Sequence, residues 1–381
     1  MNAEARVRYT RAMTAALSAP LDRITRRFIA EGYFPGALLR VEQHGAVLLE
    51  SAWGDARTAE TPRAPMTPET FFDAASLTKL FTATAVLRLV STGALALDTR
   101  VGDLLELPPP LEAALHGIHI TELLTHTSGI PWWYPFYTRR HEPFTGILQD
   151  VVPARPRRGE VVYSDLNFMI LGLMIEQAMR KGLAAAMEEL VLGPLGLRRT
   201  SFCPPLGAAA ATESGNRIEK RMVSEMGLTF DGWRDDSRPI VGEPNDGNCF
   251  YYFKGAAGHA GIFASAGDLC RLGRLYLDGG RVDGKPWLAA GLAERATREQ
   301  APGRGLGFQL GQTFPPGACG HTGFTGTCLA LFPDRGVAAA VLTNRLHVFE
   351  PRDITPYRME VLHVLAAQTS VSHGGGGNAV S

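Results

Sequence analysis

The stretch from Leu77 to Gly93 most limits what this chain can fold into, because a helix there would be apolar on nearly every face. A surface helix has one apolar face, whereas a helix that is apolar all round lies inside a protein. Gly93 is a typical residue for ending such a helix. The stretch therefore predicts a buried helix in the middle of the molecule, with other elements packed around it.

Strand-like runs lie near both ends of the chain, and a mostly helical section lies between them. Apolar alternation about His44-Gly45 predicts a hairpin of residues 37–42 and 47–53. Later strands are predicted over residues 307–312, 326–332 and 337–343. Helical spacing of apolar residues predicts helices over residues 15–32, 165–179, 268–277 and 358–368.

This order predicts an α/β fold of the α+β type, in which an antiparallel β-sheet built from both termini is flanked by helices. We expect residues 1–97 and 259–370 to form this sheet domain and residues 98–258 to form a helical insertion domain. Residues 371–381, which include a run of glycines, are predicted to be a disordered tail.

Charge and composition exclude several classes of function. The 381 residues are 45% apolar and 20% charged, as in an ordinary soluble enzyme. The 38 basic residues balance 38 acidic residues, and no segment carries the basic stripe that nucleic acid binding needs. No run reaches the ~20 apolar residues of a membrane helix. We therefore expect neither a nucleic acid nor a membrane as partner.

The distribution of cysteines also limits which disulfides and metal sites the chain can form. There are five of them, scattered and without a CxxC pair: Cys203, Cys249, Cys270, Cys319 and Cys328. This pattern predicts free thiols and neither disulfides nor a zinc site, and we expect no metal and no cofactor. The first residues contain no apolar segment of a secretory signal, which predicts a cytoplasmic protein, or an exported one if a leader has been removed.

Ser76-Leu77-Thr78-Lys79 lies where a loop becomes the buried helix. Residues three apart share a helical face, so the Lys79 amine can reach the Ser76 hydroxyl. The helix N-terminus favours negative charge on Ser76, and burial is expected to lower the pKa of Lys79 so that it can accept a proton. The alternative is that Ser76 only caps the helix and Lys79 extends to water.

A second segment, Tyr163-Ser164-Asp165, brings a phenol and a carboxylate to the start of a predicted helix. A phenol can serve as a proton donor or acceptor in catalysis. The alternative is that Tyr163 is a packed aromatic and Asp165 a helix cap.

A third segment, His321-Thr322-Gly323, leads through Phe324 into a predicted strand. Small residues there let a strand edge approach another backbone closely. The Phe324 N–H could then join the Ser76 N–H in an oxyanion hole. The alternative is a simple turn.

The three segments, taken together and in this chain order, resemble motifs of the serine β-lactamases and DD-peptidases, specifically the class C branch with its carboxypeptidase and esterase relatives. That family carries Ser-x-x-Lys, then Tyr-x-Asn, then Lys/His-Thr/Ser-Gly. The resemblance runs from about Pro35 to about Asn344.

The resemblance implies a serine hydrolase of esters or amides, of the carboxypeptidase, amidase or esterase type, that acts on a small molecule or short peptide. Ser76 would form an acyl-enzyme, and Lys79 and Tyr163 would share general acid–base duty. The residues expected at the oxyanion hole or the substrate are Phe324, His321, Thr322, Gly323, Asp165 and Asn344.

Two residues depart from the family pattern. Asp165 replaces the usual Asn and adds a carboxylate that could pair with Lys79 and hold it charged. His321 replaces the Lys of true class C β-lactamases. Both departures favour a peptidase, amidase or esterase over an efficient β-lactamase. The alternatives are an acyltransferase that uses the same acyl-enzyme and a catalytically silent binding protein on this fold. The oligomeric state stays open.

Overall fold

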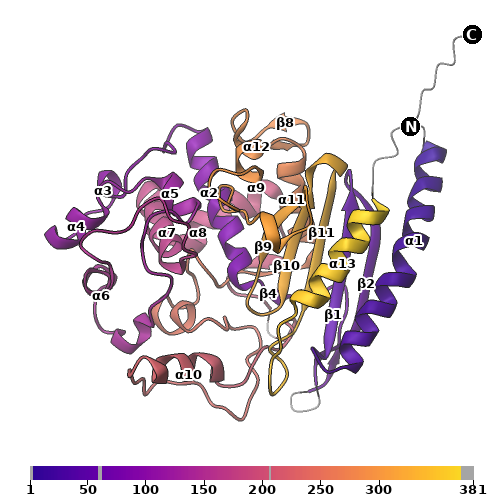
Figure 1. Cartoon of the computed structure of the whole chain (residues 1–381), viewed down its shortest axis with the longest axis horizontal. Helices are drawn as coiled ribbons and strands as arrows, with labels where there is room; N and C mark the ends of the chain where they lie inside the picture. The colour runs from indigo at the N-terminus through magenta and orange to yellow at the C-terminus, as the bar shows by residue number, and fades with distance from the viewer. Residues whose placement is uncertain (1–2, 59–61, 206, 370–381) are drawn as a thin grey trace, which may run out of the picture.

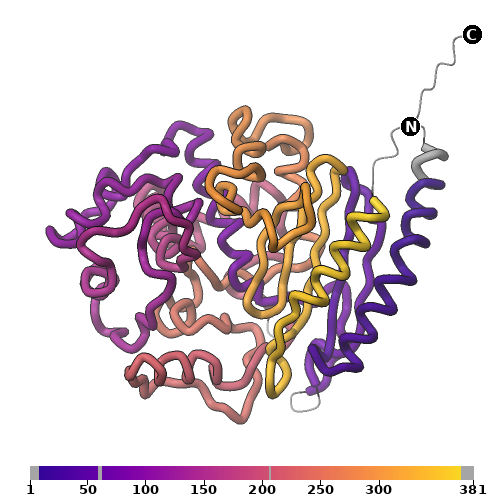
Figure 2. Tube along the Cα trace, in the orientation of Figure 1, coloured from indigo at the N-terminus to yellow at the C-terminus, as the bar shows by residue number. Residues whose placement is uncertain are grey.

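The computed structural model describes residues 3–58, 62–205 and 207–369, and side chains from residue 8 onward. The tail predicted over residues 371–381 lies outside the described residues. Figures 1 and 2 show a sheet with helices on both sides and a helical section beside it. The mixed architecture with an antiparallel sheet confirms the predicted fold class.

The main sheet has six strands in the order β3-β2-β1-β11-β10-β9, each antiparallel to its neighbours. Its strands are β1 (Gly36–Gln43), β2 (Ala46–Arg57), β3 (Ala64–Pro65), β9 (Cys319–Thr322), β10 (Thr327–Phe332) and β11 (Val337–Thr343). The predicted first hairpin is confirmed, and its two turn residues, His44 and Gly45, both have positive φ, at 47° and 76°. That conformation matches the twist of a tight hairpin.

Helices cover both faces of this sheet (Figure 1). Helices α1 (Ala3–Ala30) and α13 (Thr355–Gln368) pack over one face, and α11 (Ala266–Leu277) packs over the other. Alternate residues of a strand point into opposite layers. Leu39 faces the α1–α13 core, while Leu38 faces the core that contains α2. No helix within the described ranges is long and apolar enough to cross a membrane.

The remaining elements lie mainly in the helical section. Its helices are α3 (Val101–Leu104), α4 (Pro109–Leu115), α5 (Ile120–Leu124), α6 (Phe144–Val151), α7 (Asp165–Met179), α8 (Leu183–Met187), α9 (Gly193–Leu195) and α10 (Arg217–Glu225). Outside it lie α12 (Leu292–Thr297) and the strand pair β7 (Arg281–Val282) and β8 (Lys285–Pro286). A small sheet β4-β6-β5 joins Phe72–Asp73, Phe263–Ala264 and Thr200–Ser201. The division into a sheet domain and a helical insertion domain stays a prediction.

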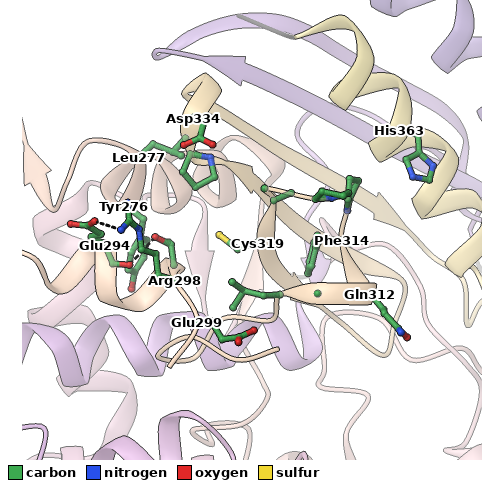
Figure 3. A pocket seen from close by; sticks show the side chains of 18 of the residues that line it. Tyr276, Leu277, Glu294, Arg298, Glu299, Gln312, Phe314, Cys319, Asp334 and His363 are labelled. Atoms are coloured by element: carbon green, nitrogen blue, oxygen red, sulfur yellow. Dashed lines mark hydrogen bonds and ion pairs between the residues drawn. The ribbon is translucent and has the colours of Figure 1, made fainter. Parts of the chain in front are cut away.

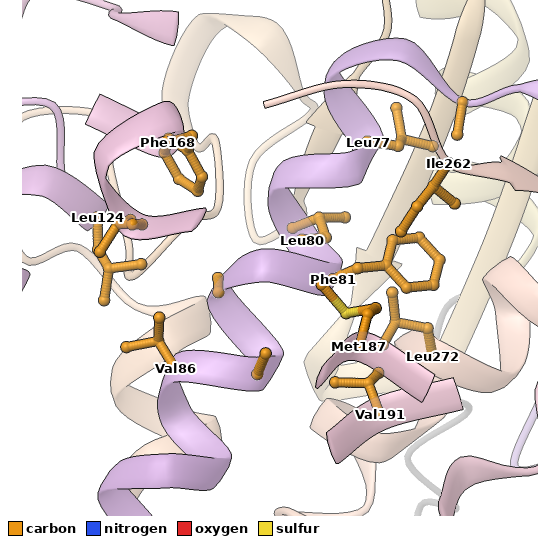
Figure 4. Close-up of a cluster of buried hydrophobic side chains, with 14 of the residues drawn as sticks. Leu77, Leu80, Phe81, Val86, Leu124, Phe168, Met187, Val191, Ile262 and Leu272 are labelled. Carbon is orange, nitrogen blue, oxygen red and sulfur yellow. The ribbon is translucent and has the colours of Figure 1, made fainter. Parts of the chain in front are cut away.

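Helix α2 (Thr78–Ser91) is the buried central helix that its composition predicts. Figure 4 shows Leu80 and Phe81 packed among side chains from both the helical section and the sheet side. Leu80, Phe81 and Val86 are all fully buried. Because α2 starts two residues after Ser76, this packing fixes the position of the first candidate site residues.

The strand predicted over residues 307–312 is wrong. The structure has only two isolated bridges there, from Gln309 to Arg304 and to Gly320, followed by a short 3-10 turn at Gly311–Thr313. Gly307 and Gly311 have φ of 84° and 68°, and a Cβ on Gly307 would lie 2.5 Å from the Ala83 Cβ. The glycines therefore bend the segment onto α2 instead of extending it as a strand.

Candidate active site

Ser76 lies in a 3-10 turn, Ala75–Leu77, that leads directly into α2. Ala75 has a positive φ of 47°, which is uncommon for a residue with a side chain. The buried Asp73 stabilises this turn, because its Oδ1 accepts from the Ala75 N–H at 2.9 Å. Burial raises the pKa of Asp73 to about 6, despite hydrogen bonds from two backbone N–H groups. Sequence reasoning did not identify this carboxylate as a support for Ser76.

The side chains of the three predicted catalytic residues meet at the Ser76 hydroxyl. Tyr163 OH donates to Ser76 Oγ at 2.8 Å, and Lys79 Nζ donates to the same oxygen at 3.0 Å. Ser76 does not act as a helix cap, since α2 has no side-chain cap. Lys79 does not extend to water, because its side chain is 0% exposed. Both alternatives for this motif are therefore excluded.

Lys79 has two further partners, an ion-pair partner and a hydrogen-bond acceptor. Its Nζ lies 2.7 Å from Asp165 Oδ1 and donates to the His259 carbonyl at 3.1 Å. Burial lowers the pKa of Lys79, but the charges of Asp165 and Tyr163 outweigh burial and leave the pKa above its ordinary value. The expectation that burial would lower this pKa is therefore wrong, and the pairing with Asp165 explains why.

Tyr163 is fixed by its neighbours as well as by Ser76. Its ring lies 4.7 Å from the ring of His126, whose Nδ1 accepts from the Ser164 N–H at 3.0 Å. Burial raises the pKa of Tyr163, and the nearby Lys79 opposes that shift without cancelling it. Burial also holds the pKa of His126 well below its ordinary value. The site therefore contains a neutral phenol beside a neutral imidazole.

The loop that follows β9 lies against the Ser76 turn. Thr325 Oγ1 donates to the Asp73 carbonyl at 2.7 Å, and Thr327 Oγ1 donates to the Ala74 carbonyl at 3.0 Å. A Cβ on Gly323 would lie 2.7 Å from the Ala74 carbonyl oxygen, so only glycine permits this approach. Sequence reasoning identified Gly323 but missed the two threonine contacts.

This contact between the two loops brings two backbone donors to the same region. Within the described residues, the N–H groups of Ser76 and Phe324 donate to no other group of the protein. The Phe324 ring is 44% exposed, and the Arg345 guanidinium lies 5.3 Å from its centroid. The arrangement leaves both N–H groups available to an external acceptor.

His321 and Thr322 lie on β9 beside Tyr163. The His321 ring is 6.1 Å from the Tyr163 ring, and its Nδ1 lies 2.8 Å from the Thr322 carbonyl. Burial, together with the charge of Lys79, lowers the pKa of His321 well below its ordinary value. Thr322 Oγ1 donates to Gln309 at 3.2 Å. A neutral His321 cannot supply the positive charge that a lysine would supply at this position.

Asn344 is not brought to the Ser76 cluster by its contacts. Its Nδ2 donates to the carbonyls of Asp55 and Ala56, and its Oδ1 accepts from the Gly36 N–H at 2.9 Å. The side chain thus joins β1 and β2 at the end of β11. Its hydrogen-bonding groups are occupied by the backbone and not directed at a substrate.

Arg304 is a site residue that sequence reasoning missed. Its guanidinium lies 5.4 Å from the Tyr163 ring centroid and is largely buried, which lowers its pKa. Across the described ranges it forms no ion pair with a carboxylate. The only sequence signal was its place between Gly303 and Gly305, which does not indicate a ligand.

A separate cavity of about 1010 Å³ is lined by residues of α11, α12 and α13 and of the loop that leads into β9 (Figure 3). Tyr276, Phe314, Cys319 and His363 are among its lining residues, whereas Ser76, Lys79 and Tyr163 are not. No group of three or more metal-binding side chains occurs in the part of the chain that the structure describes. The candidate active site is therefore defined by the contacts around Ser76 and not by this cavity.

The sequence and the fold of this chain are similar to those of known proteins. The Beta-lactamase family model matches residues 21–363. The N-acetylmuramyl-L-alanine amidase of Bacillus subtilis (strain 168) is 30% identical in an alignment that covers 87% of this chain and 82% of the amidase.

Several solved structures share the fold, and two of them illustrate the range of relatives. EstCE1, described as a hydrolase with promiscuous acyltransferase activity, matches with a TM-score of 0.68 at 20% identity, over 92% of this chain and 99% of its own. A class C beta lactamase from Rhodobacter sphaeroides matches with a TM-score of 0.69 at 19% identity, over 91% of this chain and 98% of its own.

Proposed function

The chain belongs to the beta-lactamase family, and on that basis we propose that it cleaves an ester or amide through an acyl-enzyme on Ser76. The observation that carries this proposal is the convergence of Tyr163 OH and Lys79 Nζ on Ser76 Oγ, at 2.8 and 3.0 Å. A serine becomes a useful nucleophile when a neighbouring group manages its proton. We propose that the enzyme stands beside the class C branch, and the hydrogen bond from Tyr163 to Ser76 supports this assignment.

The proposed reaction has two halves. Ser76 Oγ attacks the substrate carbonyl, and the N–H groups of Ser76 and Phe324 stabilise the negative charge that develops on the carbonyl oxygen. The Tyr163 and Lys79 side chains manage the proton as the leaving group departs. Water then releases the acyl group. Retention of all three side chains in hydrogen-bonding contact argues against a catalytically silent binding protein.

The unpaired Arg304 indicates the substrate class. A largely buried guanidinium without a carboxylate partner favours an anionic ligand, since Arg matches the geometry of a carboxylate. His321 is held neutral and cannot take this role. We therefore propose a small molecule or short peptide whose carboxylate binds Arg304, with Thr322 on β9 as a second contact.

Replacing Arg304 with glutamine tests this subsite. We expect the KM of a carboxylate-bearing ester to rise about 10- to 100-fold with little change in kcat, because one charge-assisted hydrogen bond is lost. R304K should keep part of the affinity. The control is the matching ester without a carboxylate, whose KM should not change, and an equal loss on both esters would refute the subsite.

The acyl-enzyme itself is tested by mass spectrometry. The protein is treated with a fluorophosphonate, or with a p-nitrophenyl ester and rapid acid quenching, and the modified peptide is sequenced. We expect the adduct on Ser76. Turnover with and without added alcohol then separates hydrolysis from acyl transfer. A folded protein that carries no adduct on Ser76 would rule out the proposed function.

A further inference from the structure

The hydrogen bonds around Lys79 raise a question about which group receives the Ser76 proton. A lysine ammonium has three N–H groups and no acceptor. Lys79 Nζ has three oxygen neighbours: Ser76 Oγ at 3.0 Å, Asp165 Oδ1 at 2.7 Å and the His259 carbonyl at 3.1 Å. A charged Lys79 that donates to Ser76 Oγ and the His259 carbonyl and forms an ion pair with Asp165 has no lone pair to offer to the Ser76 hydroxyl.

Tyr163 does not solve this problem in the resting enzyme. Its OH donates to Ser76 Oγ, so the phenol also points a proton at the nucleophile. Burial keeps the phenol neutral by raising its pKa. Both neighbours of Ser76 Oγ are therefore donors, and a proton acceptor must lie one step further away.

Asp165 is the acceptor that lies one step beyond Lys79. It forms the ion pair with Lys79, and only 16% of its side chain is exposed, in contrast to 0% for Lys79. The other carboxylate near Lys79 is Asp246, whose Oδ1 already contacts His259 Nε2 at 3.0 Å and accepts from the Cys249 N–H at 2.7 Å. Asp165 is thus the carboxylate in direct contact with the Lys79 ammonium.

We propose that Asp165 is the terminal acceptor of the Ser76 proton, which it receives through Lys79. This inference rests on the proposed acyl-enzyme function. As Ser76 Oγ forms its bond to the carbonyl carbon, its O–H bond breaks and the proton moves to Lys79 Nζ. In the same step a different Lys79 proton moves to Asp165 Oδ1.

The step balances in protons and charge. Asp165 changes from carboxylate to carboxylic acid, Lys79 ends as the ammonium it was, and the negative charge now lies on the former carbonyl oxygen. When the leaving group departs, the proton returns through Lys79 to that group and Asp165 is a carboxylate again. Lys79 therefore stays positive beside the developing negative charge throughout acylation.

The proposal makes a specific prediction about pH dependence. In the wild type, kcat/KM should fall only at acid pH, when the Lys79–Asp165 pair as a unit takes up a further proton. In D165N, Lys79 itself must be neutral to act as a base. The acid limb of kcat/KM should therefore follow the pKa of the Lys79 ammonium. We expect that limb to move up by at least about two pH units.

Other titratable and charged groups around Lys79 stay the same in both proteins. His126 and His321 are held neutral by burial, so neither supplies a limb near neutral pH. The groups common to both variants, from each element packed around Lys79, are Tyr163, His126, His321, His259, Asp246 and Arg304.

The experiment measures kcat/KM of an uncharged p-nitrophenyl ester from about pH 4 to about pH 10 for wild type, D165N and D165E. We expect D165E to keep an acid limb near that of the wild type, and D165N to be reduced about 100-fold or more near pH 6. An acid limb of D165N within about half a pH unit of the wild type would overturn the proposal.

Two controls separate failure of this inference from failure of the proposed function or of folding. Fluorophosphonate labelling of Ser76 in the wild type tests the proposed function separately, so its failure is distinct from failure of this inference. If D165N does not fold, the wild type and D165E decide: acid limbs below about pH 6 support the proposal, and limbs above about pH 8 overturn it.

Discussion

Replacing Ser76 with alanine is expected to lower kcat/KM for an activated ester by about 10⁴-fold or more. The substitution removes the oxygen on which Tyr163 and Lys79 converge. It leaves the two backbone N–H groups and the substrate contacts, so a small residual activity should persist. Loss of the fluorophosphonate adduct should accompany the loss of turnover.

Ser91 provides a matched control for this measurement. It lies in the same helix, and its hydroxyl donates to the Leu87 carbonyl far from the cluster around Ser76. S91A should retain wild-type turnover and labelling. Circular dichroism and the unfolding midpoint show that S76A is folded, and a folded S76A with more than about a tenth of wild-type activity would show that another residue is the nucleophile.

Phe81→Ala should have the largest effect on stability among single substitutions in α2. Phe81 is 0% exposed and packs in the cluster that contains Met187, Ile262 and Leu272 (Figure 4). Removing a buried aromatic ring costs the transfer free energy of the ring and leaves a cavity, which together lower the free energy of unfolding by about 3–5 kcal/mol. Denaturant unfolding with an unchanged m-value measures this difference.

An exposed phenylalanine supplies the comparison. Phe349 is 82% exposed, so F349A should change the free energy of unfolding by no more than about 0.5 kcal/mol. A loss of less than about 1 kcal/mol in F81A would mean that neighbouring side chains collapse into the cavity. In that case α2 would not be the rigid support for Ser76 and Lys79 that the structure indicates.

Local patterns predicted much of this fold. The helix predicted over residues 165–179 and the strand over 337–343 coincide with α7 and β11, because side-chain periodicity follows directly from backbone geometry. The strand predicted over residues 307–312 failed for an equally local reason. Alternation suggested an extended chain, but two glycines at positive φ direct the segment onto α2.

The candidate site residues also fall into two groups, those that local patterns predicted and those that only the fold reveals. Ser76 and Lys79 follow from spacing along one helix, and the motif pattern placed Tyr163 with them. Arg304 and the Thr325 contact depend on where loops lie after folding, which periodicity does not encode. The direction of the Lys79 pKa depended on a balance between burial and the charge of Asp165. That balance is set by a distance of 2.7 Å that only the folded chain supplies.

The pairing of β1 with β11 has a consequence for synthesis of the protein. Gln43 pairs with Val337, so the first hairpin leaves the ribosome long before its partner strand exists. At about 5–20 residues per second, translation of the intervening chain takes roughly 15–60 seconds. During that interval α1, which bonds to β2 through Thr14 and Asp22, is the nearest cover for the hairpin. Whether the nascent hairpin stays free of contacts with neighbouring polypeptides therefore depends on how well α1 covers it.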